Sequence, residues 1–285
     1  MKPAAFVHHR PKTIEDAVRI LAEVAPDDGR VIAGGQSLVP IMAYRMARPP
    51  HLVDINHVAG LDRLAVEGET LSIGACVRHN AFGEGAAAGA TGALLARLMR
   101  HIAHKPIRTR GTFCGSLAHS DPSSEWCLAA AALDAVLVLQ SARGAREIAA
   151  RDYFQGVMTT ALQPDEILVE ARLPMLPDDT KTGFLEFSRR AGDFALAAVL
   201  TTFRVVDGKI AEPRFAVGGA EAFPRRLPEI EAMLAGAAPD AATWRMVADA
   251  AATLIEPLED AATSGDYRRD LVRALSLRAL EQAMA

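Results

Sequence analysis

The chain has 285 residues and a formal net charge of −4 at pH 7; half of its residues are hydrophobic and 23% are charged. This length allows two or three domains with a sizeable core, and the small negative charge gives no reason to expect nucleic acid or an anionic membrane as partner. The apolar stretches are shorter than the roughly 20 residues of a membrane span and residues 1–10 do not resemble a signal peptide, so we expect a cytoplasmic protein.

Residues 1–58 predict an N-terminal α/β unit. A helix with apolar residues at helical spacing precedes a short strand at 30–33, which runs directly into Gly34-Gly35. A second helix is expected to begin near Ser37, and residues 51–55 predict another strand.

Residues 59–175 predict a central α+β unit. Alternating apolar residues indicate strands near 71–75 and 167–173, and an apolar run indicates one at 135–139. Thr91 is the expected N-cap of a helix with an apolar face. Residues 106–124 predict a long loop, followed by a short alanine-rich helix.

Residues 176–285 predict a C-terminal domain, and the linker that leads into it is expected at 175–182. Asp207-Gly208 is a strong hairpin turn between two of its expected strands. The strands are expected at 183–190, 194–206 and 209–217, and the helices at about 228–235, 241–255 and 266–284. The fold class is therefore α+β, ending in a three-stranded antiparallel sheet with a helix bundle.

The first segment with chemical meaning is Ala33-Gly34-Gly35-Gln36-Ser37-Leu38. Adjacent glycines let the backbone take positive φ and approach a ligand closely. Backbone N–H groups exposed there would suit a pyrophosphate, and Ser37 adds a hydroxyl donor. Taken alone, a Gly-Gly pair after a strand also fits an ordinary tight turn.

The second segment runs from Thr109 to Pro122 and combines glycines with hydroxyl side chains. Segments of this kind inside a globular domain often serve function, although a routine surface loop has the same composition. His119 lies within this segment, and we expect it to make a structural hydrogen bond. Two phosphate-cradling segments well separated in the sequence suggest one long ligand, and a dinucleotide has that size.

The three cysteines, Cys76, Cys114 and Cys127, are widely spaced and odd in number, which fits a reducing compartment. An iron–sulfur cluster typically needs about four thiolates, and the chain has no CxxC or HxxxH pattern. We therefore expect no metal site in this chain, and any redox chemistry here to use an organic cofactor.

The sequences AGGQSLVP (33–40) and RGTFCGSLAHSDPSSE (110–125) resemble the flavoprotein subunits of the xanthine dehydrogenase and carbon monoxide dehydrogenase family of molybdenum hydroxylases. That family's patterns are AGGxSLxP and GTIGGNLAxADPxxD. The resemblance extends over essentially the whole chain, including Arg189–Ala195 and Tyr267-Arg268-Arg269. It implies a PCMH-type two-subdomain FAD-binding fold ahead of the C-terminal domain.

The resemblance also implies which residues bind FAD. Ala33–Ser37 would wrap the FAD pyrophosphate, Thr112–Ser116 would contact the diphosphate and flavin side, and Glu125 would bind the adenosine ribose. Leu168 and Phe194 would lie beside the isoalloxazine. The expected cofactor-binding residues are Ala33, Gly34, Gly35, Gln36, Ser37, Leu38, Gly111, Thr112, Cys114, Gly115, Ser116, Ala118, Glu125, Leu168 and Phe194, with no catalytic side chain.

The implied role is that of an electron-transfer subunit. A large subunit would carry molybdopterin, and a small subunit two [2Fe–2S] clusters that pass electrons to this FAD and on to an external acceptor, in a dimer of heterotrimers. Two alternatives stay open: a stand-alone FAD oxidoreductase acting on a small organic substrate, and a degenerate subunit that only scaffolds the complex.

Three positions depart from the family pattern. Cys114 stands where the first glycine of GG is usual, and positive φ there would cost a cysteine about 1 kcal/mol. Glu125 is one methylene longer than the usual aspartate. A lysine near the flavin in some members has no counterpart, because residues 184–187 read Phe-Leu-Glu-Phe.

Overall fold

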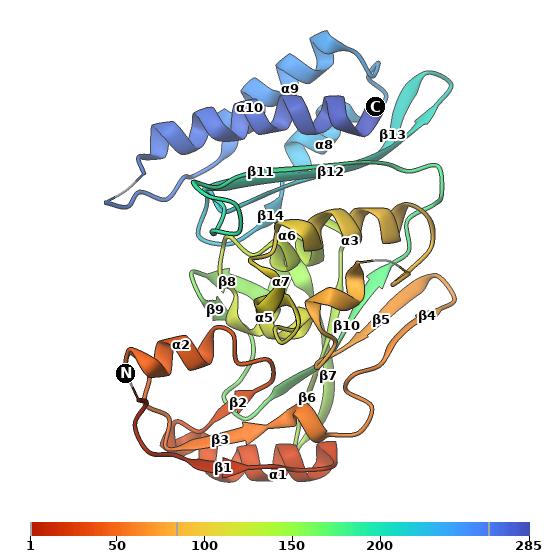
Figure 1. The fold of residues 1–285 in the computed structure, drawn as a ribbon. Coiled ribbons are helices and arrows are strands. Elements are labelled where there is room, and N and C mark those ends of the chain that lie inside the picture. Colours follow the sequence, from red (N-terminus) through yellow and green to blue (C-terminus); the bar gives the residue numbers. More distant parts are fainter. Residues whose placement is uncertain (1, 84, 262) are drawn as a thin grey trace.

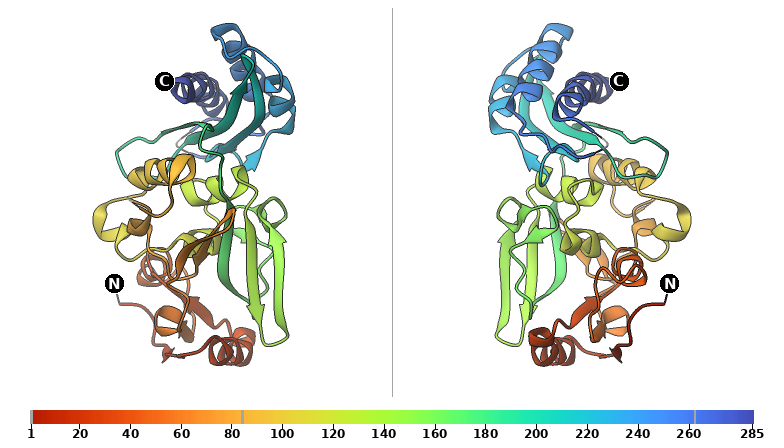
Figure 2. Two further views of the ribbon diagram at one scale, coloured as in Figure 1. Left: turned by 90° about the vertical axis from the view of Figure 1, so that its right-hand side faces the viewer. Right: turned by 90° about the vertical axis from the view of Figure 1, so that its left-hand side faces the viewer.

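The structure, a computed structural model, describes residues 2–83, 85–261 and 263–285. Its three larger sheets follow one another along the chain and along the long axis of the molecule (Figures 1 and 2). The N-terminal sheet lies at one end, the central sheet in the middle, and the C-terminal sheet with its helices at the other end.

The N-terminal sheet has three parallel strands in the order β1-β3-β2. Thr13 caps α1 by accepting a hydrogen bond from the Asp16 N–H, and the buried face of α1 packs against the sheet. The elements are β1 (Val7–His9), α1 (Ile14–Val24), the 3-10 turn η1 (Ala25–Asp27), β2 (Arg30–Ile32), α2 (Leu38–Ala43), β3 (His51–Asp54) and η2 (Ile55–His57).

The central sheet is antiparallel, with the order β4-β5-β10-β6-β7. Its strands are β4 (Leu64–Glu67), β5 (Thr70–Gly74), β6 (Val136–Ser141), β7 (Gly144–Ala149) and β10 (Ile167–Pro174), and β8 (Phe154–Gly156) pairs with β9 (Thr159–Thr160) beside it. The helical elements are η3 (His79–Phe82), α3 (Gly89–His101), α4 (Lys105–Arg108), α5 (Phe113–His119), α6 (Glu125–Ala132) and α7 (Ala150–Tyr153).

Two expectations for this part were wrong. Residues 106–124 are not a loop, because they contain most of α4 and all of α5. Thr91 is not an N-cap, since α3 begins at Gly89 after Ala88. Thr91 is instead fully buried and accepts a hydrogen bond from the Leu176 N–H at 2.7 Å.

The C-terminal sheet contains the three expected antiparallel strands and a two-residue fourth strand at its edge, in the order β11-β12-β13-β14. Three helices cover one face, and α3 and α6 of the central part lie against the other (Figure 1). The elements are β11 (Lys181–Phe187), β12 (Ala197–Val206), β13 (Lys209–Gly218), β14 (Arg225–Arg226), α8 (Pro228–Leu234), α9 (Ala241–Leu254) and α10 (Gly265–Met284).

Two hydrophobic cores hold these layers together. The larger one contains buried residues from Ala17 in α1 to Ala216 in β13, so the N-terminal and central sheets share it. The smaller one lies between the C-terminal sheet and helices α8 to α10. Because burial of apolar surface is the main stabilising term, the shared core fixes the N-terminal sheet against the central one. No helix among the described residues is long and apolar enough to cross a membrane.

Candidate cofactor-binding site

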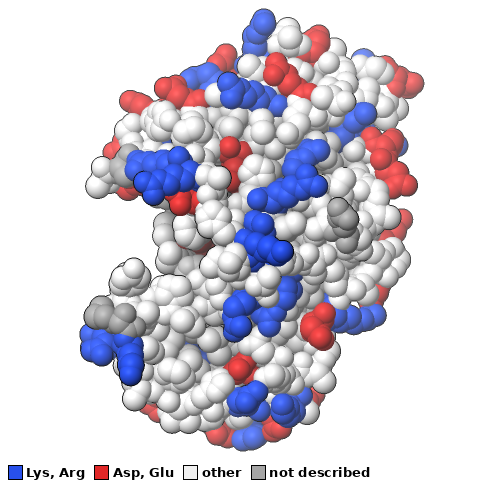
Figure 3. Space-filling view, in the orientation of Figure 1, with Lys and Arg blue, Asp and Glu red and all other residues white. Residues whose placement is uncertain are grey.

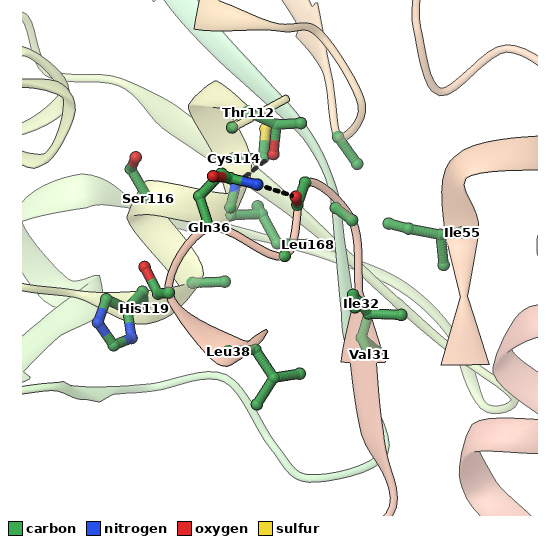
Figure 4. A pocket seen from close by; sticks show the side chains of 18 of the residues that line it. Val31, Ile32, Gln36, Leu38, Ile55, Thr112, Cys114, Ser116, His119 and Leu168 are labelled. Atoms are coloured by element: carbon green, nitrogen blue, oxygen red, sulfur yellow. Dashed lines mark hydrogen bonds between the residues drawn. The ribbon is translucent and has the colours of Figure 1, made fainter. Parts of the chain in front are cut away.

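A cavity of about 250 Å³ lies where the end of β2 and the loop after it face α5 and the start of β10. Figure 4 shows side chains from both sides of this cavity. Both glycine-containing segments predicted from the sequence line it, as does Leu168. The expected residues at its wall are Ala33, Gly34, Gly35, Gln36, Ser37, Leu38, Gly111, Thr112, Cys114, Gly115, Ser116, Ala118 and Leu168.

The first loop presents backbone donors that have no partner in the part of the chain that the structure describes. None of the N–H groups of residues 34–38 donates a hydrogen bond to another described residue. Gly35 has a φ of 70°, the left-handed conformation that glycine adopts without strain. The Gln36 side chain holds the turn by donating to the Gly34 carbonyl at 3.0 Å (Figure 4). Consecutive unpaired N–H groups in such a turn form a concave site for an anion.

The second segment is a short helix and not an open loop. Thr112 caps α5 by accepting a hydrogen bond from the Gly115 N–H at 3.0 Å. Ser116 and His119 of this helix lie on the opposite side of the cavity from Val31 and Ile55 (Figure 4).

Cys114 does not adopt positive φ, because it is the second residue of α5. The strain considered from the sequence is therefore absent at this position. Its buried thiol donates to the Ile73 carbonyl at 3.5 Å. Burial raises the pKa of the thiol, and the charges of Cys76 and Glu170 also raise it.

The two segments touch through glycines. A Cβ atom on Gly34 would overlap the carbonyl oxygen of Arg110 and lie 2.7 Å from the Cα atom of Gly111. A Cβ atom on Gly111 would in turn lie 2.7 Å from Cδ2 of His79. Both positions therefore need glycine for close approach and not for an unusual φ.

Asn56 and Arg78 clamp the two segments together, and the sequence analysis missed both. Asn56 donates to the Ala33 carbonyl at 2.7 Å and accepts from Arg78 at 2.5 Å. Arg78 also donates to the Arg110 carbonyl. The available signal was their place in the chain, since each polar residue closely follows a predicted strand.

His79 is a further missed residue at the cavity wall. It is buried, and its Nδ1 atom accepts a hydrogen bond from the Trp126 indole N–H at 2.9 Å. Burial, together with the charges of Arg78 and Arg108, lowers the pKa of His79 to about 4. The ring is therefore neutral at pH 7 with its proton on Nε2, the nitrogen that lies near Gly111.

Both apolar side chains and polar groups line the cavity. The apolar side chains come from β2, α2, η2 and β10, and the polar groups are the N–H groups that have no partner among the described residues and the hydroxyls of Ser37 and Ser116. Ser37 precedes α2 but its side chain makes no capping bond, so its hydroxyl is available. Such an arrangement fits a ligand with a flat ring system joined to a diphosphate, and the residues present therefore fit FAD.

Glu125 and Phe194 lie outside this cavity. Glu125 begins α6, and burial together with the charge of Glu186 raises the pKa of its carboxyl to about 8. Glu186 pairs with His101, with 3.1 Å between Oε1 and Nδ1. Phe194 is 67% exposed in the turn between β11 and β12.

Family models match both parts of the chain. The model described as "FAD binding domain in molybdopterin dehydrogenase" matches residues 4–176, and "CO dehydrogenase flavoprotein C-terminal domain" matches residues 183–283. The nicotine 6-hydroxylase medium subunit of Paenarthrobacter nicotinovorans is 38% identical over 285 residues, which is all of this chain and 99% of the relative. The carbon monoxide dehydrogenase medium chain of Hydrogenophaga pseudoflava is 32% identical over 285 residues, all of this chain and 99% of the relative.

Solved structures agree with this pattern. Carbon monoxide dehydrogenase from Hydrogenophaga pseudoflava has a chain that superposes with a TM-score of 0.95 at 33% identity, covering 100% of this chain and 99% of that one. Quinoline 2-oxidoreductase from Pseudomonas putida 86 gives a TM-score of 0.92 at 32% identity, covering 99% of this chain and 98% of that one.

Proposed function

The chain belongs to the family of FAD-binding medium subunits of molybdenum hydroxylases, and from this premise we propose that it is the electron-transfer subunit of its complex. In this role it receives electrons from iron–sulfur clusters on a small partner subunit and passes them to an external acceptor. The observation that carries the proposal is the cavity in which two glycine-containing segments meet, beside backbone N–H groups that are unpaired within residues 2–83, 85–261 and 263–285.

The FAD diphosphate would be held by the N–H groups of residues 34–38 with the hydroxyls of Ser37 and Ser116. Leu168 and the apolar residues of β2 would pack against a ring of the cofactor. When bound, FAD supplies the one- and two-electron redox chemistry, and the protein supplies binding, orientation and local electrostatics. Glu125 and Phe194 would meet parts of a long cofactor that extend beyond the cavity.

The Asn56–Arg78 clamp keeps the two segments at a fixed separation, which holds the anion site ready for the diphosphate. Neutral His79 carries its proton on Nε2 and adds no charge to the site. We further propose residues 1–58 and 59–175 as the two parts that enclose the cofactor, followed by a C-terminal unit at 176–285.

The iron–sulfur clusters and molybdopterin belong, in this proposal, to partner subunits. The three cysteines are all buried, and each thiol donates to a different backbone carbonyl: Cys76 to Ile55, Cys114 to Ile73 and Cys127 to Ser116. Relatives carry names such as "Nicotine 6-hydroxylase medium subunit" and "Caffeine dehydrogenase subunit beta". A dimer of heterotrimers is the assembly we propose.

The substrate that is hydroxylated would bind on another subunit. Relatives named for nicotine, caffeine and carbon monoxide match this chain at 38%, 34% and 32% identity over nearly its whole length. We propose that the choice of substrate lies outside this chain, and its similarity to relatives named for such different compounds supports this.

The test compares the isolated chain with the co-expressed complex. The isolated chain should show the absorption of bound FAD and no bleaching with any organic hydroxylation substrate. The complex should bleach at the flavin bands when its substrate is added. Stoichiometric reduction of the flavin by substrate in the isolated chain would overturn the proposal in favour of a stand-alone oxidoreductase, and a chain that binds no FAD would favour a scaffolding role.

A further inference from the structure

A second cavity, of about 280 Å³, lies where the segment between β10 and β11 meets the C-terminal sheet. Its wall comes from that segment, from β12, β13 and β14, and from Asp134 after α6. Among the described residues, none lines both this cavity and the cofactor cavity. Figure 1 shows the segment at the right of the molecule, and Figure 3 shows acidic and basic side chains close together along that edge. A cavity of this volume suits a small ligand.

The backbone is irregular at two points of the wall. Phe203 of β12 faces both Glu212 and Pro213 of β13, because the register between these strands shifts there. Glu212 has a φ of 50° and Asp134 a φ of 54°, the left-handed conformation that non-glycine residues rarely adopt. Bulges of this kind redirect neighbouring side chains, and residues at such φ values are frequent at ligand sites. Both irregular points contribute side chains to this cavity.

Two of the three arginines at the wall, Arg204 and Arg226, are each paired with two carboxylates. The four carboxylates, at N···O distances of 2.5–3.3 Å, are Asp134, Asp179, Glu212 and Glu231. These two guanidinium groups are therefore already occupied. Because the carboxylates outnumber them, the surroundings oppose a ligand that carries more than one negative charge.

Arg214 is the third arginine, and it differs from the other two. Its Nε atom lies 3.7 Å from Oδ2 of Asp134, and its guanidinium donates no hydrogen bond to any residue that the structure describes. The side chain is only 27% exposed. A guanidinium presents several N–H donors in a fixed plane, so those of Arg214 are available to a ligand in the cavity.

Thr180 supplies a second donor at the same wall. Its Oγ1 atom is buried and has no hydrogen-bond partner within the described ranges of the chain. A buried hydroxyl without a partner destabilises a folded protein, and a bound acceptor removes that cost. The cavity thus brings together a cationic donor and a hydroxyl donor that the chain itself does not use.

We propose that this cavity binds a small hydroxy acid as its monocarboxylate, with Arg214 and Thr180 as the donors. A carboxylate matches the planar guanidinium through two parallel hydrogen bonds. It carries a single negative charge, whereas a phosphate group carries more than one at neutral pH and would be repelled by the nearby carboxylates. Most of the lining side chains are polar or charged, so a hydroxy acid suits the wall better than a fatty acid.

The experiment uses the whole chain in the presence of FAD, with L-lactate as the probe. Methyl lactate, the neutral ester, and inorganic phosphate are the comparison probes. Arg214→Gln removes the charge, and Thr180→Val removes the hydroxyl while it keeps the shape of the side chain. Arg245→Gln is the matched control, because Arg245 is an exposed arginine of α9 with no ion pair among the described residues. Equal circular dichroism and equal FAD content establish that the variants fold.

Binding is measured by isothermal titration calorimetry. Wild type and Arg245→Gln should bind lactate saturably and with equal affinity, and Arg214→Gln should bind it at least about 10-fold more weakly. Thr180→Val should bind it roughly 3- to 10-fold more weakly. Without lactate, Thr180→Val should unfold at the same or a higher temperature than wild type, because it lacks the unpaired hydroxyl. A purely structural role for Thr180 would instead lower that temperature and leave lactate affinity unchanged.

Three outcomes would overturn the proposal. The first is a wild-type chain that does not bind lactate saturably, and the second is an Arg214→Gln variant that binds it as tightly as wild type. The third is binding of methyl lactate or of phosphate at least as tight as that of lactate. None of these outcomes bears on the flavin, because the cofactor cavity has a separate wall.

Discussion

The indole N–H of Trp126 donates to Nδ1 of His79 at 2.9 Å, and both side chains are buried. This bond joins the first turn of α6 to η3 and fixes the tautomer of a histidine at the cavity wall. Since Nδ1 is occupied as an acceptor, a second proton on the ring would break the bond.

His79 should make the chain acid-sensitive. Its pKa is lowered from 6.5 to about 4 in the folded state, so the unfolded chain binds the proton first as pH falls. The contribution of His79 to the free energy of unfolding is fully present above pH 6.5 and is lost as pH falls toward 4. It amounts to roughly 3 kcal/mol. Urea unfolding of the apo chain at pH 7 and pH 4.5 should show a larger loss of stability for wild type than for His79→Gln. Parallel losses in the two proteins would contradict this role.

Glu125 should lower the stability of the folded chain as pH rises, the opposite of the effect of His79. Its pKa is raised from 4.5 to about 8, so the folded state retains the proton over a range where the unfolded state has lost it. The stabilising contribution is complete below pH 4.5 and is lost as pH rises through 8. Glu125→Gln should therefore gain stability over wild type by about 2 kcal/mol between pH 5 and pH 9, less than the full shift because the side chain is partly exposed. A difference that does not change with pH would refute the shift.

Gly34→Ala should weaken FAD binding by moving the two segments apart. The added methyl group would meet the Arg110 carbonyl, and overpacking of this kind costs about 1–3 kcal/mol. Gly156→Ala is the matched control, because its Cβ atom would have no neighbour closer than 3.8 Å. Titration of each apo protein with FAD, followed by flavin fluorescence, measures the two affinities. Unchanged affinity in Gly34→Ala would show that the segments do not meet around the cofactor.

FAD should be bound without a covalent link. The Cys114 thiol is buried against the Ile73 carbonyl and its pKa is raised by burial, so little thiolate forms. Acid precipitation should release yellow flavin into the supernatant. Colour that remains with the precipitated protein would point to an attachment at Cys114.

Cys114→Gly should keep FAD and lose stability. The sequence comparison with the family favours glycine at this position, but the structure places a buried side chain inside α5. Glycine there adds backbone entropy to the unfolded state and leaves a cavity, together about 1–2 kcal/mol. Denaturant unfolding measures this loss, and a gain in stability would argue that the thiol is strained.

The sequence predicted the strands that carry the site and the two segments that line the cavity, because those signals are local. Gly34 and Gly35 follow a strand directly, and Asp207-Gly208 forms the hairpin at positive φ in both residues. The short helix α5 escaped prediction because Thr112, Gly115 and the neighbouring hydroxyl residues have low helix propensity, and the helix depends on a cap and on burial.

The clamp of Asn56 and Arg78 could not be derived from local pattern. Neither residue stands out in its own segment. Their role depends on a tertiary contact between residues that are 22 positions apart in the sequence. The same holds for His79, whose proton position depends on Trp126, 47 residues later.

The close approach of Gly34 to residues 110–111 has a consequence for how such proteins diverge. Two segments that touch backbone to backbone cannot accumulate substitutions independently, because a side chain at Gly34 requires a compensating shift in a distant stretch of the same chain. Exchange of residues 1–58 between relatives should therefore need these glycines in both parents, in addition to a core that matches across the two units. These glycines thus limit which N-terminal and central units can be combined, and they do so through backbone contact and not through side-chain chemistry.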